Sequence, residues 1–367
     1  MQSLARLAQN YELTFYGSGT QALSSALALA RRGRDSKRPL EVILPAYGCP
    51  DLVAASLYAG LEIRLVDVCP DAWGYDLAQL RAALCANTVA IVGVNMLGVG
   101  DQRTVLLSEC AQHGVRLIQD SAQYLPDVAP STWCGDSVVL SFGRGKPLNL
   151  LGGGALLSRT DPIATFDATW REQMTRRILT SRAAAIAFNL ATHRRVYPVT
   201  ARLPGLKIGG TRYSPLRGCY QMPEDFRFRI GSALSRFQLQ ENYSATPWME
   251  ALAEWQTMGL RLLSCDGDLK SDVQYLRLPL VAPSSKIRDI ILARLNAAGL
   301  GASAMYEVPL NRIASVPEAI RRQGPFPGAE SLAARLFTLP THEGVTPRII
   351  TQTRREIRLA MRSVQSG

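Results

Sequence analysis

Residues 13–30 read LTFYGSGTQALSSALALA, a stretch in which an apolar run ends at a turn of small residues and a helical pattern follows. Residues 13–16 have the composition of a strand, and the apolar positions after residue 22 recur at helical spacing. Between them, Ser18-Gly19-Thr20 places two hydroxyls and unpaired backbone N–H groups at the start of the helix. Such a turn suits a phosphate group. An ordinary helix N-cap accounts for the same residues.

The same strand–helix unit recurs along the first 160 residues. Apolar runs at residues 13–16, 42–44, 63–68, 89–94, 115–118 and 138–142 alternate with helical patterns at 22–31, 52–58, 77–84 and 104–113. Repeated βα units predict an α/β fold with a mostly parallel central sheet and helices on both faces. Ligands of such sheets bind beyond the carboxyl ends of the strands. The residues that follow each run are therefore the site candidates.

Two further candidates follow the fifth and sixth runs. Asp120, with Gln123 three residues later, follows the fifth run, where an acid can be a cap, a metal ligand or the counter-ion of a buried cation. Ser141 ends the sixth run and Lys146 follows it, between two glycine clusters. Lysines in Gly-rich loops are commonly solvated, but a catalytic amine belongs at such an edge. A P-loop is excluded, because Pro147 follows the lysine where Ser or Thr is required.

The order of these three features suits pyridoxal phosphate (PLP). This cofactor needs a lysine amine for covalent attachment, a carboxylate that keeps its pyridine nitrogen protonated, and a cradle for its phosphate. Lys146 supplies the amine, Asp120 supplies the carboxylate, and the turn at residues 18–20 supplies the phosphate cradle.

The sequence resembles the DegT-type sugar aminotransferases, a family of the fold-type-I PLP enzymes. The resemblance runs through most of the chain and is carried by four ordered motifs. These are the S-G-T-x-A-L turn at residues 18–23, the D-x-A-Q element at 120–123, the S-F-x-x-x-K element at 141–146, and the L-P-x-H stretch at 339–342.

The resemblance implies a role for each matching residue. Lys146 would form the Schiff base and act as the proton-transfer base, Asp120 would pair with the pyridine nitrogen, and Gln123 would contact the phenolic oxygen of the ring. The phosphate would be held by four residues: Ser18, Gly19, Thr20 and Ser141.

The resemblance also implies a homodimer whose active sites borrow residues from the partner chain. Family members use an N-x-R-M element for this, and residues 227–230 read RFRI here. Arg227 and Arg229 are therefore expected to reach the cofactor phosphate of a second copy. Arg227 stands where the family has Asn, which would make its contact ionic.

A second departure concerns the residue that stacks on the cofactor. In residues 45–51, PAYGCPD, Cys49 occupies the place where many relatives have an aromatic ring. Tyr47 or a neighbour is the expected substitute.

Composition bounds the remaining alternatives. The chain has 367 residues with 47% hydrophobic content, enough for a large core in two lobes. Seven scattered cysteines without a C-x-x-C pair or a secretory signal suit a reducing cytoplasm. Three histidines lack the spacing of metal ligands, so no metal site is expected.

An apparent insertion at residues 171–217 carries most of the net charge. It contains ten Lys and Arg residues against one acid, in a chain of net charge +11. Three explanations remain open: an ordinary solvated basic segment, a surface for anionic lipid or an acidic carrier, and recognition of a nucleotide diphosphate. Its apolar stretch is too short to span a membrane. Nucleic acid is disfavoured, because no DNA-reading motif or aromatic platform is present.

We expect residues 1–240 to form a large PLP-binding domain and residues 241–367 a smaller α+β domain. The expected activity is transfer of an amino group from an amino acid such as glutamate to a keto or aldehyde acceptor, a keto sugar or a lipid- or carrier-linked biosynthetic intermediate in sugar or polysaccharide biosynthesis. The alternatives are other PLP chemistry on the same fold and a non-catalytic PLP-binding regulator or scaffold. The expected location is the cytoplasm, peripheral to the inner membrane surface if the basic segment binds lipid.

Overall fold

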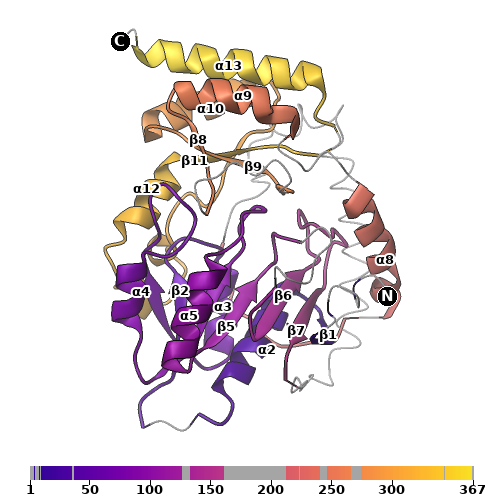
Figure 1. Cartoon of the computed structure of the whole chain (residues 1–367), viewed down its shortest axis with the longest axis vertical. Helices are drawn as coiled ribbons and strands as arrows, with labels where there is room; N and C mark the ends of the chain where they lie inside the picture. Colours follow the sequence, from indigo (N-terminus) through magenta and orange to yellow (C-terminus); the bar gives the residue numbers. More distant parts are fainter. Residues whose placement is uncertain are drawn as a thin grey trace.

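In the computed structural model, the chain forms two layers, and each layer is built around one sheet (Figure 1). The described residues are 4, 8, 10–34, 37–125, 133–160, 212–222, 224–239, 246–265, 274–342 and 344–365. Most of the basic segment, residues 171–211, lies outside them.

Seven strands of the described chain form the large sheet, in the order β1-β7-β6-β5-β4-β2-β3. They are β1 (Glu12–Tyr16), β2 (Glu41–Pro45), β3 (Glu62–Val66), β4 (Thr88–Val94), β5 (Arg116–Asp120), β6 (Ser137–Ser141) and β7 (Gly154–Ser158). Neighbours from β3 to β6 pair in parallel, and β7 pairs antiparallel with both β6 and β1. β1 therefore runs in the same direction as β6, and the expectation of a mostly parallel sheet is confirmed. β7 was not among the strands predicted from the sequence.

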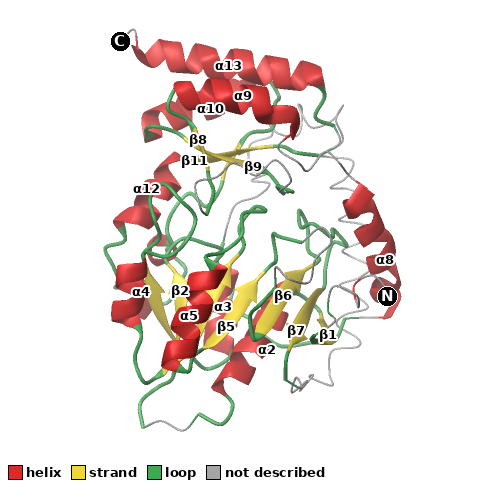
Figure 2. Cartoon of the chain, viewed as in Figure 1, coloured by secondary structure: helices red, strands yellow, loops and turns green. Residues whose placement is uncertain are grey.

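Helices cover both faces of this sheet (Figure 2). α2 (Gly19–Arg31) and α3 (Asp51–Tyr58) share a core cluster with Val42 and Leu44, whereas α4 (Leu77–Ala83) and α5 (Arg103–His113) pack on Ile43 and Ile91. Successive strand residues point to opposite faces, so the uninterrupted apolar runs are those of strands buried on both sides. α8 (Glu224–Leu239) packs its residues Ile230, Ala233, Leu234 and Phe237 over β6 and β7.

A smaller antiparallel sheet forms the second layer, in the order β10-β11-β9-β8. Its strands are β8 (Arg261–Leu262), β9 (Leu278–Val281), β10 (Ser303–Ala304) and β11 (Leu336–Leu339). The helices nearby are η3 (Thr246–Trp248), α9 (Met249–Thr257), α10 (Ser285–Ala297) and α13 (Pro347–Gln365). Arg354 and Arg358 of α13 both pair with Glu254 of α9, which ties these two outer helices together.

The segment between β10 and β11 returns to the large sheet. It contains η4 (Leu310–Arg312), α11 (Glu318–Arg321) and α12 (Pro327–Arg335). Buried Asp67 accepts hydrogen bonds from the backbone N–H groups of Gly328 and Ala329, each at 2.8 Å, and thereby caps α12. Gln323 bonds both the N–H of Leu65 and the C=O of Ile63 along the edge strand β3. The boundary between two domains at residue 240 stays a proposal. The hydrogen bonds of Asp67 and Gln323 join residues on the two sides of that boundary.

Candidate active site

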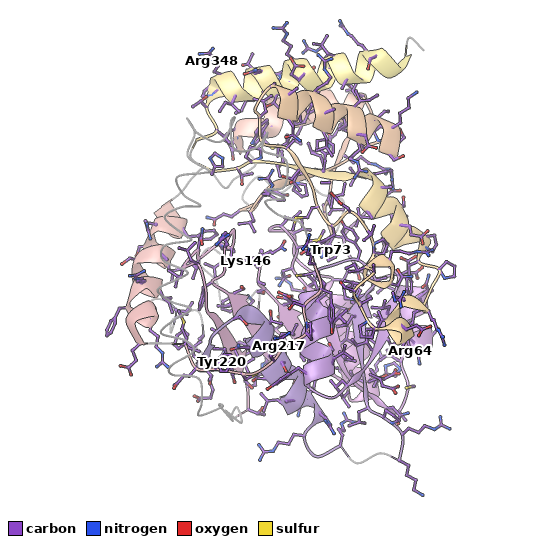
Figure 3. The ribbon with its side chains drawn as sticks, turned by 180° about the vertical axis from the view of Figure 1, so that it is seen from behind. Arg64, Trp73, Lys146, Arg217, Tyr220 and Arg348 are labelled. Atoms are coloured by element: carbon purple, nitrogen blue, oxygen red, sulfur yellow. The ribbon has the colours of Figure 1, made fainter. Side chains whose placement is uncertain are left out.

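A cavity lies at the carboxyl edge of the large sheet and brings together most of the residues expected from the sequence. Figure 3 shows Lys146 at the end of this sheet that faces the small sheet. The cavity has about 570 Å³ of empty space, counted to its open mouth. Its lining residues are Gly19, Thr20, Leu23, Gly48, Cys49, Asp51, Leu52, Val94, Asn95, Met96, Asp120, Ala122, Gln123, Ser141, Lys146 and Tyr306.

The turn after β1 forms a close-packed wall of the cavity. A Cβ added to Gly19 would lie 2.7 Å from the Cβ of Ser141, so only glycine lets the turn approach β6 this closely. Ser18 is the N-cap of α2, and its hydroxyl accepts a hydrogen bond from Gln21 N–H at 3.2 Å. The backbone N–H of Thr20, which has no acceptor within the helix, is left at the cavity. Ser18 itself caps the helix and is absent from the lining, whereas Gly19, Thr20 and Ser141 belong to it.

Asp120 is the last residue of β5 and is 9% exposed. Its Oδ1 accepts a hydrogen bond from Ala122 N–H at 3.0 Å, the single hydrogen bond of this carboxylate to the described residues. Burial raises the pKa of Asp120, and this rise is opposed by that hydrogen bond and by the positive charge of Lys146. A buried carboxylate with so few partners is costly unless a cation lies against it. The site therefore fits a cationic ring nitrogen.

Lys146 supplies the amine at this edge. It follows β6, is half-buried, and makes no hydrogen bond or ion pair with any residue that the structure describes. Its positive charge favours the ionised forms of Asp120 and Cys49 across the cavity. It therefore opposes the rise in pKa that burial causes in each of these two groups.

Gln123 is held in a fixed orientation by two partners. Its Oε1 accepts a hydrogen bond from Leu97 N–H at 3.0 Å, and its Nε2 donates to the hydroxyl of Tyr306, also at 3.0 Å. The second hydrogen on Nε2 remains for a ligand in the cavity. The sequence analysis missed Tyr306, which comes from the segment after β10.

Two more lining residues were missed. Asn95 follows β4, and its side chain bonds the hydroxyl of Ser121 at 2.7 Å and the N–H of Asp101 at 2.8 Å. The rule that selected Asp120 also selects Asn95, because both lie at the carboxyl end of a parallel strand. Asp51 begins α3 and accepts a hydrogen bond from the hydroxyl of Thr20 at 3.0 Å.

Cys49 and Tyr47 have different places in the structure. Cys49 lines the cavity, and burial together with the nearby charge of Asp51 raises its pKa to about 12. This thiol therefore stays protonated at neutral pH. Tyr47 is fully buried, donates hydrogen bonds to the carbonyls of Met305 and Tyr306, and does not line the cavity.

Arg227 and Arg229 lie on α8 and not in the cavity of their own chain. The guanidinium of Arg227 lies over the ring of Phe15, 5.3 Å from its centroid, and its buried Nε has no hydrogen-bond partner among the described residues. Arg229 is exposed beside Phe228, which is itself 78% exposed.

Within the described ranges, no group of three His, Cys, Asp or Glu residues is arranged to hold a metal ion. No helix among the described residues is long and apolar enough to cross a membrane.

Comparisons with known proteins relate the chain to one enzyme family. Residues 2–183 match the DegT/DnrJ/EryC1/StrS aminotransferase family. A UDP-N-acetyl-3-dehydro-alpha-D-glucosamine 3-aminotransferase of Acidithiobacillus ferrooxidans is 28% identical over 149 residues, which are 40% of this chain and 40% of that protein. The chain spans about two fifths of the length of the curated relatives it matches.

Solved structures match over nearly the whole chain. A DegT DnrJ EryC1 StrS aminotransferase from Brucella abortus has a TM-score of 0.69 at 20% identity, covering 97% of this chain and 88% of the other. The protein NtdA of Bacillus subtilis, solved with its cofactor PMP bound, has a TM-score of 0.71 at 17% identity, covering 98% of this chain and 76% of the other. The fold is therefore that of the fold-type-I PLP aminotransferases. By sequence over residues 2–183 and by fold over the whole chain, this protein is a relative of the DegT/DnrJ/EryC1/StrS aminotransferase family.

Proposed function

We propose that this protein is a PLP-dependent aminotransferase. The observation that carries the proposal is the buried carboxylate of Asp120, which shares one cavity with the amine of Lys146 and the N-terminus of α2. PLP, when bound, withdraws electrons from the substrate carbon and accepts the amino group of the donor. The family relationship supports the same cofactor.

Each end of the cofactor has matching groups in the chain. The amine of Lys146 would bond covalently to the aldehyde and, once released, move a proton at its Nζ. Asp120 would keep the pyridine nitrogen protonated, and Gln123 would donate its remaining Nε2 hydrogen to the phenolic oxygen. The Thr20 N–H and the hydroxyl of Ser141 would bind the phosphate. The hydroxyl of Thr20 would join them by turning from Asp51, to which it donates in this structure.

Cys49 is the residue proposed to lie against the cofactor ring, since Tyr47 is held in the core. A thiol covers less of a ring than an aromatic side chain does. We therefore expect more room on that face of the ring than an aromatic neighbour would leave.

The proposed acceptor is a keto sugar, and the proposed donor an amino acid such as glutamate. The sugar aminotransferase among the relatives supports this acceptor class. A lipid- or carrier-linked acceptor remains a finer proposal that depends on the basic segment at residues 171–217. If that segment binds lipid, the protein should sediment with anionic vesicles at low salt and not with neutral ones.

Half-reactions test the proposal. The protein loaded with PLP should be yellow, and an amino acid donor should convert the cofactor to PMP, which is seen as loss of the visible band. Borohydride should trap a covalent adduct at Lys146 in the wild type and none in Lys146→Ala. A spectrum unchanged by every amino donor would favour the non-catalytic regulator, and a full adduct in Lys146→Ala would refute the assignment of this lysine.

A further inference from the structure

A second cavity lies at the opposite, amino edge of the large sheet. It has about 900 Å³ of empty space, counted to its mouth in the same way as for the first cavity. It is bounded by the end of α2, the end of α5, and the segments that lead into β5 and β6. α2 begins at the candidate active site and ends here, so its 13 residues separate the two cavities by about 20 Å.

The lining of this second cavity is strongly basic. It contains Arg32, Arg34, Arg116 and Arg159 against one acid, Asp136, which leaves a formal charge of +3. A concave surface lined mainly by one sign of charge concentrates the opposite ion. Arginine is also the side chain that best binds phosphate oxygens in pairs.

The contacts of these arginines leave most of their donors unused. Arg116 pairs with Asp136 at 2.6 Å, and its side chain remains 52% exposed. Arg34 donates to the carbonyl of Gly114, and Arg159 donates to the carbonyl of Cys134 at 3.2 Å. The guanidinium of Arg159 also lies over the ring of Tyr11, 5.5 Å from the ring centroid. The guanidinium of Arg32 makes no hydrogen bond or ion pair with the described part of the chain. Each guanidinium has five N–H donors, so these two bonds to carbonyls and the one ion pair occupy a minority of the donors.

The floor of the second cavity is apolar. Leu29, Ala30 and Leu117 contribute to it, and Leu107 of α5 is 38% exposed at its rim. Guanidinium N–H donors around an apolar floor suit a small organic molecule that carries phosphate.

We propose that this cavity is a second binding site, for a small molecule that carries one or two phosphate groups. It is distinct from the candidate active site and does not depend on the proposed function. Its position at the amino edge places the bound anion away from Lys146, so the ligand is not a substrate of the candidate active site.

Inorganic pyrophosphate is a suitable probe. It is titrated at low salt into protein saturated with PLP, and binding is measured by calorimetry. PLP fills the phosphate site of the first cavity and prevents binding there. The wild type should bind one pyrophosphate per chain at this site, and higher salt should weaken binding.

Substitutions at Leu107 change the charge at the rim of this cavity and leave in place the arginines that make structural contacts. Leu107→Glu should raise the dissociation constant for pyrophosphate about three- to tenfold, and Leu107→Lys should lower it by a similar factor. Leu57 of α3 is 37% exposed and serves as the matched control, because it is absent from this cavity. Leu57→Glu and Leu57→Lys should leave the constant unchanged. Arg32→Gln should weaken binding like Leu107→Glu.

Three results would overturn the proposal. The first is no saturable binding of pyrophosphate to the wild type. The second is a dissociation constant that stays within twofold in both Leu107 variants and in Arg32→Gln. The third is an equally large response to the Leu57 pair, which would place the binding elsewhere. If PLP does not load, the Leu107 and Leu57 pairs still report on this cavity alone.

Discussion

The side-chain amide of Gln123 donates a hydrogen bond to the hydroxyl of Tyr306 at 3.0 Å, although 183 residues separate the two in sequence. Gln123 lies in the turn that follows β5 of the large sheet, and Tyr306 lies in the segment that follows β10 of the small sheet. The backbone of Tyr306 has φ +30°, a conformation that is uncommon for a residue with a large side chain. The surrounding contacts, including the hydrogen bond from Tyr47 to the Tyr306 carbonyl, maintain it.

Tyr306→Phe should therefore impair the site without unfolding the protein. The change removes one buried hydrogen bond and leaves the Gln123 amide held only by the N–H of Leu97, so we expect a loss of about two- to tenfold in kcat/KM. A shift in the pH at which the visible band of the PLP-loaded protein titrates should accompany it. Tyr58→Phe, at a position 45% exposed on α3, is the matched control and should change neither quantity. An unaltered titration in Tyr306→Phe would mean that this hydroxyl does not orient Gln123.

Asp120→Asn should separate the electrostatic role of this residue from a structural one. Without the carboxylate the pyridine nitrogen loses its counter-ion, so turnover should fall by roughly a hundredfold or more while some cofactor still binds. Near-normal turnover would show that Asp120 serves only as the acceptor for Ala122 N–H.

The alternation of strands and helices along the chain could be predicted from the sequence, because burial on both faces leaves uninterrupted apolar runs between helical patterns. β7 was missed because Gly154–Ser158 follows a glycine cluster, which resembles a loop. The cavity residues that follow parallel strands, such as Asp120 and Lys146, were also accessible, since strand direction alone brings their positions to one edge.

Tyr306 could not be predicted in this way. It reaches the cavity through the packing of the segment between β10 and β11 on the large sheet, which depends on pairs distant in sequence such as Asp67 with Gly328. Tyr47 illustrates the converse, because its place in the motif suggested the cavity but its ring points into the core. No local pattern distinguishes these two tyrosines.

Asp101 should make the stability of the protein depend on pH. Burial raises its pKa to about 6, opposed by hydrogen bonds from Gln119. Because the folded-state pKa lies above the unfolded one, ionisation of Asp101 destabilises the fold as pH rises from about 4 to 6. Asp101→Asn removes this cost, so the stability of this variant relative to the wild type should increase over that window by up to about 3 kcal/mol and then level off. Urea unfolding at several pH values measures this, and a difference that is constant with pH would contradict it.

Complementation between two inactive variants tests whether the active unit is a dimer. If Arg229 of one chain reaches the cofactor phosphate of the other, each site of the dimer needs Lys146 from one chain and Arg229 from its partner. In a mixed dimer of Lys146→Ala and Arg229→Ala chains, one site lacks both residues and the other has both. Mixing the two inactive proteins should therefore restore activity, up to about half of the wild-type value per mixed dimer. Arg236→Ala, on the same helix, should be active by itself and is the control for disruption of α8. Absence of recovery in isolated mixed dimers would show that Arg229 acts within its own chain or has no part in the site.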